Sequence, residues 1–159
     1  MGKEIERKFL VTGDGWRAGT GTHYRQGYLS VAKERTVRVR IEGDAARLTI
    51  KGITENATRD EFEYPIPVPD ARAMLDSLCL RPLIEKHRYR LEYHGLTWEI
   101  DEFLGDNAGL IVAEIELEHP QQPFDRPPWI GTEVTEDPRY YNANLVDRPY
   151  RVWDTPDES

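Results

Sequence analysis

The chain has 159 residues, of which 38% are hydrophobic and 31% are charged, and its formal net charge is −8. This length suits one folded domain with its own core, and the acidic balance disfavours non-specific binding to nucleic acid or to an anionic membrane. The single cysteine, Cys79, excludes an internal disulfide and a cysteine-rich metal site, and we expect a buried core thiol. No apolar leader and no stretch long enough to span a bilayer is present, so we expect a soluble cytoplasmic protein.

Charged and apolar residues alternate through the first half of the chain with the two-residue period of β-strands. Gly27 marks a possible bulge, and the turn signal at Gly43 and Asp44 joins two strands into a hairpin. The glycine-rich residues 13–21 lack the ending of a phosphate-binding loop, so we expect a flexible link there. The strands predicted in this half cover residues 4–11, 24–31, 36–42, 47–51 and 59–66.

A helix signal precedes the strands of the second half. Asp70 is a suitable N-cap, and residues 71–80 carry apolar side chains at helical spacing. Prolines between residues 119 and 129 predict an extended surface segment, and residues 137–145 are expected to form a short helix starting at Pro138. The further predicted strands cover residues 85–93, 97–103 and 111–118. We expect one domain over residues 1–153 and a loose tail at residues 154–159.

The polar faces of these strands carry charged side chains far more often than serine, threonine, asparagine or glutamine. About eight strands are enough to close a barrel. If the apolar faces pack outward against helices and loops, the charged faces line an internal cavity. Such a cavity must be wet, self-paired or filled by a charged ligand, because unpaired buried charge is costly. The inverse arrangement, with apolar faces inside and charges in water, fits the same alternation, so periodicity alone leaves both open.

The charged residues follow an order that resembles the CYTH superfamily, also called the triphosphate tunnel metalloenzymes. The similarity begins with Glu4, Glu6 and Lys8 and extends to about residue 145. The later motifs, in order, are Arg38-x-Arg40, Leu48-Thr49-Ile50-Lys51, Arg59-x-Glu61-x-Glu63, Glu85-Lys86-x-Arg88, Glu99-Ile100-Asp101 and Glu114-Ile115-Glu116. The resemblance implies a mainly β fold: a closed eight-stranded antiparallel β-barrel that forms a charged tunnel, with a few flanking helices. The short chain is most similar to small prokaryotic members that hydrolyse inorganic triphosphate.

The resemblance, together with residue chemistry, implies a role for each charged position. Arginine and lysine suit phosphate oxygens, and carboxylates suit Mg²⁺ or Mn²⁺. The expected phosphate contacts are Lys8, Arg38, Arg40, Lys51, Arg59, Arg88 and Arg139. The expected metal ligands are Glu4, Glu6, Asp101, Glu114 and Glu116, with Glu61 and Glu63 as supporting acids that orient arginines. The expected catalytic residues are Lys86 and Tyr28.

Several alternatives stay open at this point. A second metal ion, rather than Lys86 acting as general base, is an equally valid activator of the attacking water. Tyr28 either orders that water or packs as an aromatic residue, and Arg139 is either a phosphate contact or a surface arginine. The rival functions are a class IV adenylate cyclase, a thiamine triphosphatase, a non-catalytic polyphosphate- or nucleotide-binding module, and a purely structural barrel. We expect a small anionic substrate and a monomer or homodimer.

Overall fold

The computed structural model of the chain describes residues 2–18 and 21–153, and within them nine strands form one antiparallel sheet. No helix in this described part is both long and apolar enough to cross a membrane. The strands are β1 (Gly2–Val11), β2 (Thr22–Ser30), β3 (Thr36–Glu42), β4 (Ala45–Lys51), β5 (Thr58–Pro65), β6 (Ile84–Tyr93), β7 (Leu96–Phe103), β8 (Ile111–Glu116) and β9 (Ile130–Glu133). The helices are α1 (Val68–Ser77) and α2 (Asn144–Asp147), with single 3₁₀ turns η1 (Gly15–Arg17), η2 (Gly105–Asn107), η3 (Pro138–Tyr140) and η4 (Tyr150–Val152).

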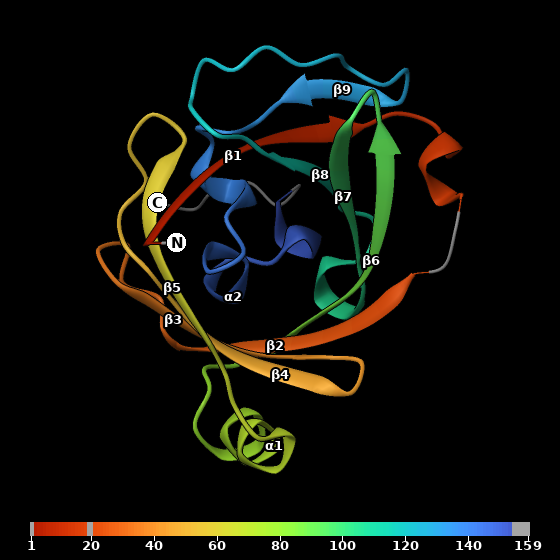
Figure 1. Cartoon of the computed structure of the whole chain (residues 1–159). Helices are drawn as coiled ribbons and strands as arrows, with labels where there is room; N and C mark the ends of the chain where they lie inside the picture. The colour runs from red at the N-terminus through yellow and green to blue at the C-terminus, as the bar shows by residue number, and fades with distance from the viewer. Residues whose placement is uncertain (1, 19–20, 154–159) are drawn as a thin grey trace.

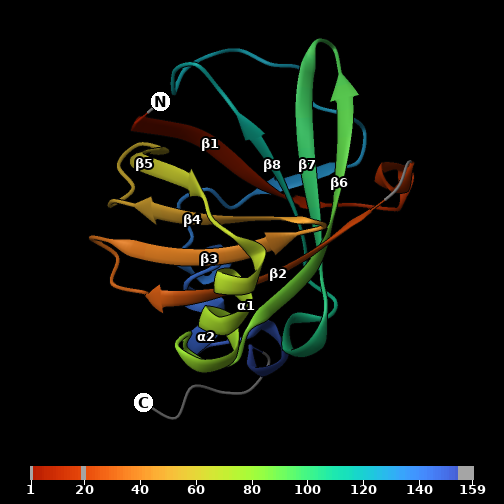
Figure 2. The same ribbon diagram turned by 60° about the horizontal axis from the view of Figure 1, so that its bottom comes forward.

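Strand β1 closes the sheet into a barrel because it has two partners along one edge. The strand order is β5-β4-β3-β2-β6-β7-β8-β1, and the first half of β1 pairs back to β5, with Gly2 opposite Glu61. The second half of that edge pairs instead with β9, where Phe9 lies opposite Glu133. Figure 1 looks into the resulting ring, and Figure 2 shows the strands from the side. The expected closed barrel of eight strands is confirmed, with β9 added outside it.

The outward faces of the strands are apolar and are covered from two sides. Helix α1 lies outside the ring, and its Ala71 and Leu75 pack on Val39 of β3 and Ala46 of β4. On the opposite wall, a second cluster of buried residues joins β1, β7 and β8 to η1 and to the segment before β9; its members are Phe9, Trp16, Trp98, Ile100, Ala113, Ile115 and Leu117, with Phe124 and Trp129 packed against them. The barrel is therefore held from outside, which leaves its interior available for charge.

One end of the barrel interior is apolar, and we call this cluster the apolar floor. On the inward face, Lys8 is followed by Leu10, and Phe103 follows Asp101 two positions along β7. The segment around η3 and α2 lies within the ring in Figure 1 and packs against these residues. The apolar floor consists of Tyr28, Ile84, Phe103, Leu110, Val112, Val134, Tyr140, Leu145 and Val146.

Several local expectations are corrected. Helix α1 begins at Val68 after an N-cap at Pro67, so Asp70 lies in its first turn, and it ends at Ser77 because Leu78 leaves the helix. The bulge in β2 lies between Tyr28 and Ser30 rather than at Gly27. Gly27 instead lets α1's end approach the strand, because a Cβ there would lie 2.8 Å from the Cβ of Cys79. Cys79 is buried, as expected.

The connections also differ from expectation. The predicted flexible link at residues 13–21 contains η1, whose Trp16 is fully buried and donates from Nε1 to the Gly13 oxygen at 2.9 Å. Strand β9 was not predicted, because it follows the proline-rich segment and has only four residues. The expected helix at residues 137–145 is divided into η3 and α2, with the predicted start at Pro138 confirmed. The expected tail at residues 154–159 lies outside the described residues.

Candidate active site

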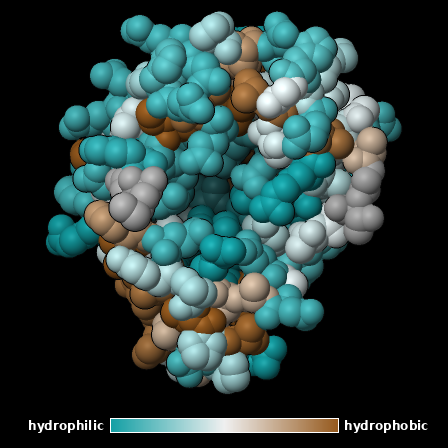
Figure 3. Space-filling view, viewed as in Figure 1, coloured by the Kyte–Doolittle hydropathy of each residue, from teal (hydrophilic) through white to brown (hydrophobic). Residues whose placement is uncertain are grey.

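The inward side chains line a cavity of about 950 Å³ inside the barrel. In the space-filling view along the barrel, the hollow is lined by hydrophilic residues (Figure 3). Every strand of the ring except β7 contributes expected site residues to its lining, and β7 contributes Glu99. The expected residues that line the cavity are Glu4, Glu6, Lys8, Tyr28, Arg38, Arg40, Lys51, Arg59, Glu61, Glu63, Lys86, Arg88, Glu114 and Glu116. The structure therefore selects the arrangement with charges inside.

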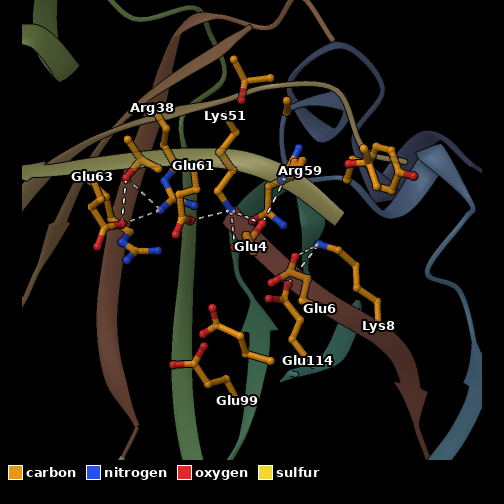
Figure 4. A pocket seen from close by; sticks show the side chains of 18 of the residues that line it. Glu4, Glu6, Lys8, Arg38, Lys51, Arg59, Glu61, Glu63, Glu99 and Glu114 are labelled. Carbon is orange, nitrogen blue, oxygen red and sulfur yellow. Dashed lines mark hydrogen bonds and ion pairs between the residues drawn. The ribbon is translucent and has the colours of Figure 1, made fainter. Parts of the chain in front are cut away.

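Glu4 is the centre of a three-residue ion-pair cluster between β1, β4 and β5. The Lys51 Nζ atom lies 2.8 Å and 3.0 Å from the two Glu4 carboxylate oxygens, and Arg59 Nε lies 3.3 Å from Oε1. Figure 4 shows Lys51 and Arg59 pointing toward Glu4. Burial alone opposes ionisation of Glu4, but these two cations hold its pKa at about 2. Glu4 is thus a carboxylate that Lys51 and Arg59 already neutralise.

Glu6 and Glu114 lie side by side on β1 and β8 with Lys8 as their shared cation. Lys8 Nζ lies 3.1 Å from a Glu114 oxygen and 3.6 Å from a Glu6 oxygen (Figure 4). Burial and the charge of Glu114 raise the pKa of Glu6 to about 8, while Lys8 and Arg88 hold the pKa of Glu114 low despite its burial. One cation cannot neutralise both carboxylates, so Glu6 keeps its proton near neutral pH and the pair carries one negative charge rather than two.

Asp101 contacts two cations and is not among the residues that line the cavity, so its role as a metal ligand stays a prediction. It lies directly opposite Arg88 in the β6–β7 pairing, and both its oxygens accept from Arg88, at 2.7 Å and 2.8 Å. Its Oδ2 atom also lies 2.7 Å from Lys86 Nζ. Although burial opposes its ionisation, Arg88 and Lys86 hold the pKa of Asp101 at about 2. Its carboxylate therefore holds the side chains of Arg88 and Lys86 in place.

Lys86 is the buried amine of the site, with an exposed fraction of 1%. Its Nζ atom contacts Asp101 and donates to Asn142 Oδ1 at 3.1 Å. Burial lowers the pKa of Lys86 to about 7, because removing the ammonium from water outweighs its attraction to Asp101. A lysine with this pKa is partly neutral near neutral pH and can accept a proton.

Arg38 and Arg40 of β3 and Arg88 of β6 form a cationic wall of the cavity. The pKa of Arg40 falls to about 10 through burial and the neighbouring charges of Arg38 and Arg88. The Nε atoms of Arg38 and Arg40 are buried and have no hydrogen-bond partner among the described residues. Like charges that crowd together with unused donors are stabilised by a polyanion. This wall is the strongest sign of an anionic ligand.

Three further acids of the expected set, Glu61, Glu63 and Glu116, line the cavity. Glu63 accepts from Arg47 at 3.1 Å and from Thr49 Oγ1 at 3.0 Å, and Glu61 lies 3.4 Å from Lys51 Nζ. Glu63 thus contacts an arginine, as expected of a supporting acid, whereas Glu61 contacts a lysine. Glu116 is opposite Glu6 in the β1–β8 register, and burial together with the charge of Glu4 raises its pKa.

Of the two remaining expected residues, Tyr28 lies at the cavity and Arg139 does not. Tyr28 is 4% exposed and belongs to the apolar floor while its side chain borders the cavity. Arg139 does not line the cavity: it is exposed, pairs with Asp137 at 2.8 Å and lies over Trp153. Arg139 is thus the phosphate contact that the structure does not bring to the site.

The lining residues that sequence reasoning missed include Glu42, Arg47, Arg90 and Asn142. The first three continue the inward parity of residues already selected on β3, β4 and β6, so their spacing was a usable signal. Asn142 lies in the turn between η3 and α2, where no periodic pattern points to the barrel interior.

In the observed arrangement, the carboxylates of the cavity fit a hard divalent cation only in part. No group of three or more His, Cys, Asp or Glu side chains in the described part of the chain is already arranged to hold a metal ion. Glu6, Glu114 and Glu116 nevertheless provide oxygen donors on neighbouring strands, where burial and neighbouring carboxylates raise the pKa of Glu6 and Glu116. A cation such as Mg²⁺ or Mn²⁺ would displace the proton of Glu6 and offset this repulsion, and such ions commonly complete their shell with water and substrate phosphate.

Comparison with known proteins agrees with this geometry. The model of the CYTH domain matches residues 2–150. A protein of Acetivibrio thermocellus named inorganic triphosphatase is 52% identical over 152 residues, which cover 95% of this chain and 97% of that protein. Another protein of the same name, from Nitrosomonas europaea, is 36% identical and covers 90% of this chain and 96% of its own length.

A solved structure of a similar protein has the same fold. A crystal structure of an inorganic triphosphatase superposes with a TM-score of 0.64 at 34% identity and covers 89% of this chain and 96% of its own. The chain therefore belongs to the CYTH domain family.

Proposed function

We propose that the chain is a divalent-metal-dependent inorganic triphosphatase that hydrolyses triphosphate to pyrophosphate and orthophosphate within the barrel. The observation that carries the proposal is the wall of Arg38, Arg40 and Arg88, where buried guanidinium groups crowd together with unused donors. Two relatives named inorganic triphosphatase, at 52% and 36% identity over nearly their whole length, support the same substrate.

The basic side chains bind and orient the substrate. Arginine offers two parallel N–H donors to a phosphate group, and lysine acts as a point charge. We assign this role to the residues of the cavity wall: Lys8, Arg38, Arg40, Lys51, Arg59 and Arg88. Lys51 and Arg59 are bound to Glu4 without substrate, so they exchange part of that interaction for phosphate contact. Arg139 is not included.

Lys86 is proposed as the general base. The oxygen of a water molecule attacks the terminal phosphorus, a proton of that water passes to the neutral amine of Lys86, and the P–O bond to pyrophosphate breaks. The lowered pKa makes the amine available at neutral pH, and Asp101 stabilises the ammonium that forms. Tyr28 borders the same region, which supports a place beside the water or the substrate in addition to its packing role.

Glu6, Glu114 and Glu116 would hold the metal ion, with Glu4 joining them if substrate draws Lys51 and Arg59 away. Bound Mg²⁺ or Mn²⁺ would neutralise charge on the phosphate chain and assist departure of pyrophosphate. Glu61 and Glu63 keep Lys51, Arg47 and Thr49 in place. We propose that the protein acts in the cytoplasm on this small anion as a monomer or homodimer.

A phosphate-release panel tests the proposal. Triphosphate, ATP, thiamine triphosphate and pyrophosphate are each incubated with Mg²⁺ or Mn²⁺, and with a chelator as control. We expect rapid release from triphosphate with metal and at least tenfold slower release from the others. Cyclic AMP from ATP would indicate a cyclase, and a preference for thiamine triphosphate would indicate that rival substrate. Tight triphosphate binding without release at any metal concentration would indicate a binding module.

A further inference from the structure

Lys86 has an unexpected neighbour from outside the strands. Asn142 lies in the turn between η3 and α2, lines the cavity, and accepts a hydrogen bond from Lys86 Nζ at 3.1 Å. The same Oδ1 atom accepts from Gln26 Nε2 on β2 at 3.2 Å. Two donors meet at one atom, so the oxygen of the Asn142 amide, and not its nitrogen, must face them.

Gln26 is buried, and its side-chain hydrogen bond is the one to Asn142. Its side chain is fully buried, and its Oε1 atom has no hydrogen-bond partner among the described residues. Since a buried polar group without a partner is costly, the Gln26–Asn142 bond is the interaction that offsets this burial. The backbone of Asn142 is also held, because Leu145 of the apolar floor donates to its carbonyl at 3.1 Å.

We propose that Asn142, fixed by Gln26, is a positioning residue that directs the lone pair of neutral Lys86 into the cavity. This inference rests on the proposed function, because it assigns Asn142 the role of orienting the amine of the same base, Lys86. An oxygen attracts an N–H and repels a lone pair. Asn142 Oδ1 and Asp101 Oδ2 lie against two sides of Nζ, at 3.1 Å and 2.7 Å. The lone pair of the neutral amine therefore points away from both oxygens.

A neutral acceptor is important at this position because the surrounding charges are already balanced. The charged groups that face Lys86 are Asp101 of β7, Arg88 of its own strand, Glu114 of β8 and Arg40 of β3. Asp101 already shares its charge between Arg88 and Lys86. An amide oxygen orients the amine without adding a negative charge that would keep it protonated.

The test compares three variants for kcat, KM and the pH dependence of kcat with triphosphate. For Asn142→Ala we expect kcat to fall about 10- to 100-fold with KM changed less than about threefold, because orientation is lost and binding is not. For Asn142→Asp the added carboxylate should shift the rising limb of the pH profile upward by about one unit or more. Gln26→Ala should reproduce a smaller part of the fall in kcat.

Two controls separate positioning from loss of structure. Asn107→Ala removes another side-chain anchor of the C-terminal segment, the 2.8 Å bond from Tyr150 N, at a distance from the cavity lining. It should lower Tm while leaving the pH profile unchanged. In the double variant Gln26→Ala with Asn142→Ala, the loss in kcat should equal that of Asn142→Ala alone, because the two residues act as one unit. Additive losses, or a larger KM effect than kcat effect, would overturn the inference.

Failure of the inference is distinguishable from failure of the proposed function. The titration of Lys86 is followed by NMR of labelled lysine side chains in metal-free protein, which needs no turnover. A higher pKa of Lys86 in Asn142→Asp than in wild type supports the positioning role of Asn142, and an unchanged pKa contradicts it. If wild-type protein releases no phosphate from triphosphate, the function fails and this NMR comparison still decides the role of Asn142.

Discussion

The inner face of the barrel has two regions that use the same strands differently. Toward one end, β1, β6 and β8 present Lys8, Lys86 and Glu114 to the cavity. Two residues further along the same inward faces, Ile84 and Val112 belong to the apolar floor. Strand periodicity is identical in both regions, so the alternation of a strand identifies its faces but not what each part of a face does.

Lys86 lies at the boundary between these regions, and its chemistry follows from that position. Its Nζ atom lies 5.4 Å from the centroid of the Phe103 ring, which belongs to the apolar floor, while Asp101 contacts it within the charged region. The floor removes water and lowers the pKa of the amine, whereas the charged region supplies the partner that tolerates its protonation. The apolar floor therefore tunes the pKa of the base by excluding water from one side of the amine.

The largest expected effect is on the base. Lys86→Met keeps the length of the side chain and should lower kcat by about 10²- to 10⁴-fold, the usual contribution of a general base, while the protein stays folded. Lys3→Met is the matched control, because Lys3 is exposed and forms a surface ion pair with Asp60 at 2.7 Å. Phosphate release and thermal unfolding are measured for both. Full activity of Lys86→Met would leave water activation to another group.

The apolar floor should respond in the opposite way. Leu145→Ala removes a fully buried side chain and should lower the free energy of unfolding by about 2–5 kcal/mol, measured by urea denaturation. At a temperature where the variant is folded, KM for triphosphate should stay within about threefold of wild type. A large increase in KM with unchanged stability would show that the floor contacts substrate, and the distinction between the two regions would then be wrong.

Metal binding should stabilise the charged region alone. Adding Mg²⁺ or Mn²⁺ at 100 times its dissociation constant should raise the free energy of unfolding by about 2.7 kcal/mol, measured as a rise in Tm. Glu6→Gln should reduce this rise, because it removes one of the proposed ligands, whereas Leu145→Ala should lower Tm and retain it. An equal rise in Tm for Glu6→Gln and wild type would contradict the assignment of Glu6.

The pH dependence of kcat should follow the protonation of Lys86, the residue at the boundary between the two regions. The pKa of Lys86 is depressed from 10.5 to about 7, so the base is protonated and inactive below that value and neutral above it. We expect kcat to rise about tenfold per pH unit below about 6.5 and to level off above about 7.5. Between pH 7 and 10.5 the unfolded chain binds this proton more tightly, so the contribution of Lys86 to stability grows as pH rises. A rate that decreases with pH through 7 would contradict this role.

The smallest expected effect is on an acid at the rim of the charged region. Burial and the charge of Glu4 raise the pKa of Glu116, and Glu116→Gln removes that repulsion. Because the residue is exposed, solvent screens the gain to less than about 1 kcal/mol. The metal-free variant should be at least as stable as wild type in urea denaturation. Glu34→Gln, in an exposed turn, is the control. Clear destabilisation by Glu116→Gln alone would mean that Glu116 has an essential partner.

The sequence predicted the strands and their charged faces well, because side-chain alternation is a local property. It did not predict which charges would pair, since that depends on register between strands. Asp101 illustrates the limit: its residue type suited a metal ligand, but the sequence did not show that both its oxygens accept from Arg88, which lies opposite it in the β6–β7 register. Asn142 and the buried Trp16 were missed because irregular segments carry no period, and only long-range packing places them.

The most direct test of the charged region is a ³¹P NMR time course of inorganic triphosphate with wild-type protein and Mg²⁺ or Mn²⁺. We expect the triphosphate resonances to disappear and orthophosphate and pyrophosphate to appear in equal amounts, with at least a 100-fold slower course for Lys86→Met. Unchanged triphosphate resonances with either metal ion, or equal rates for wild type and Lys86→Met, would contradict this expectation.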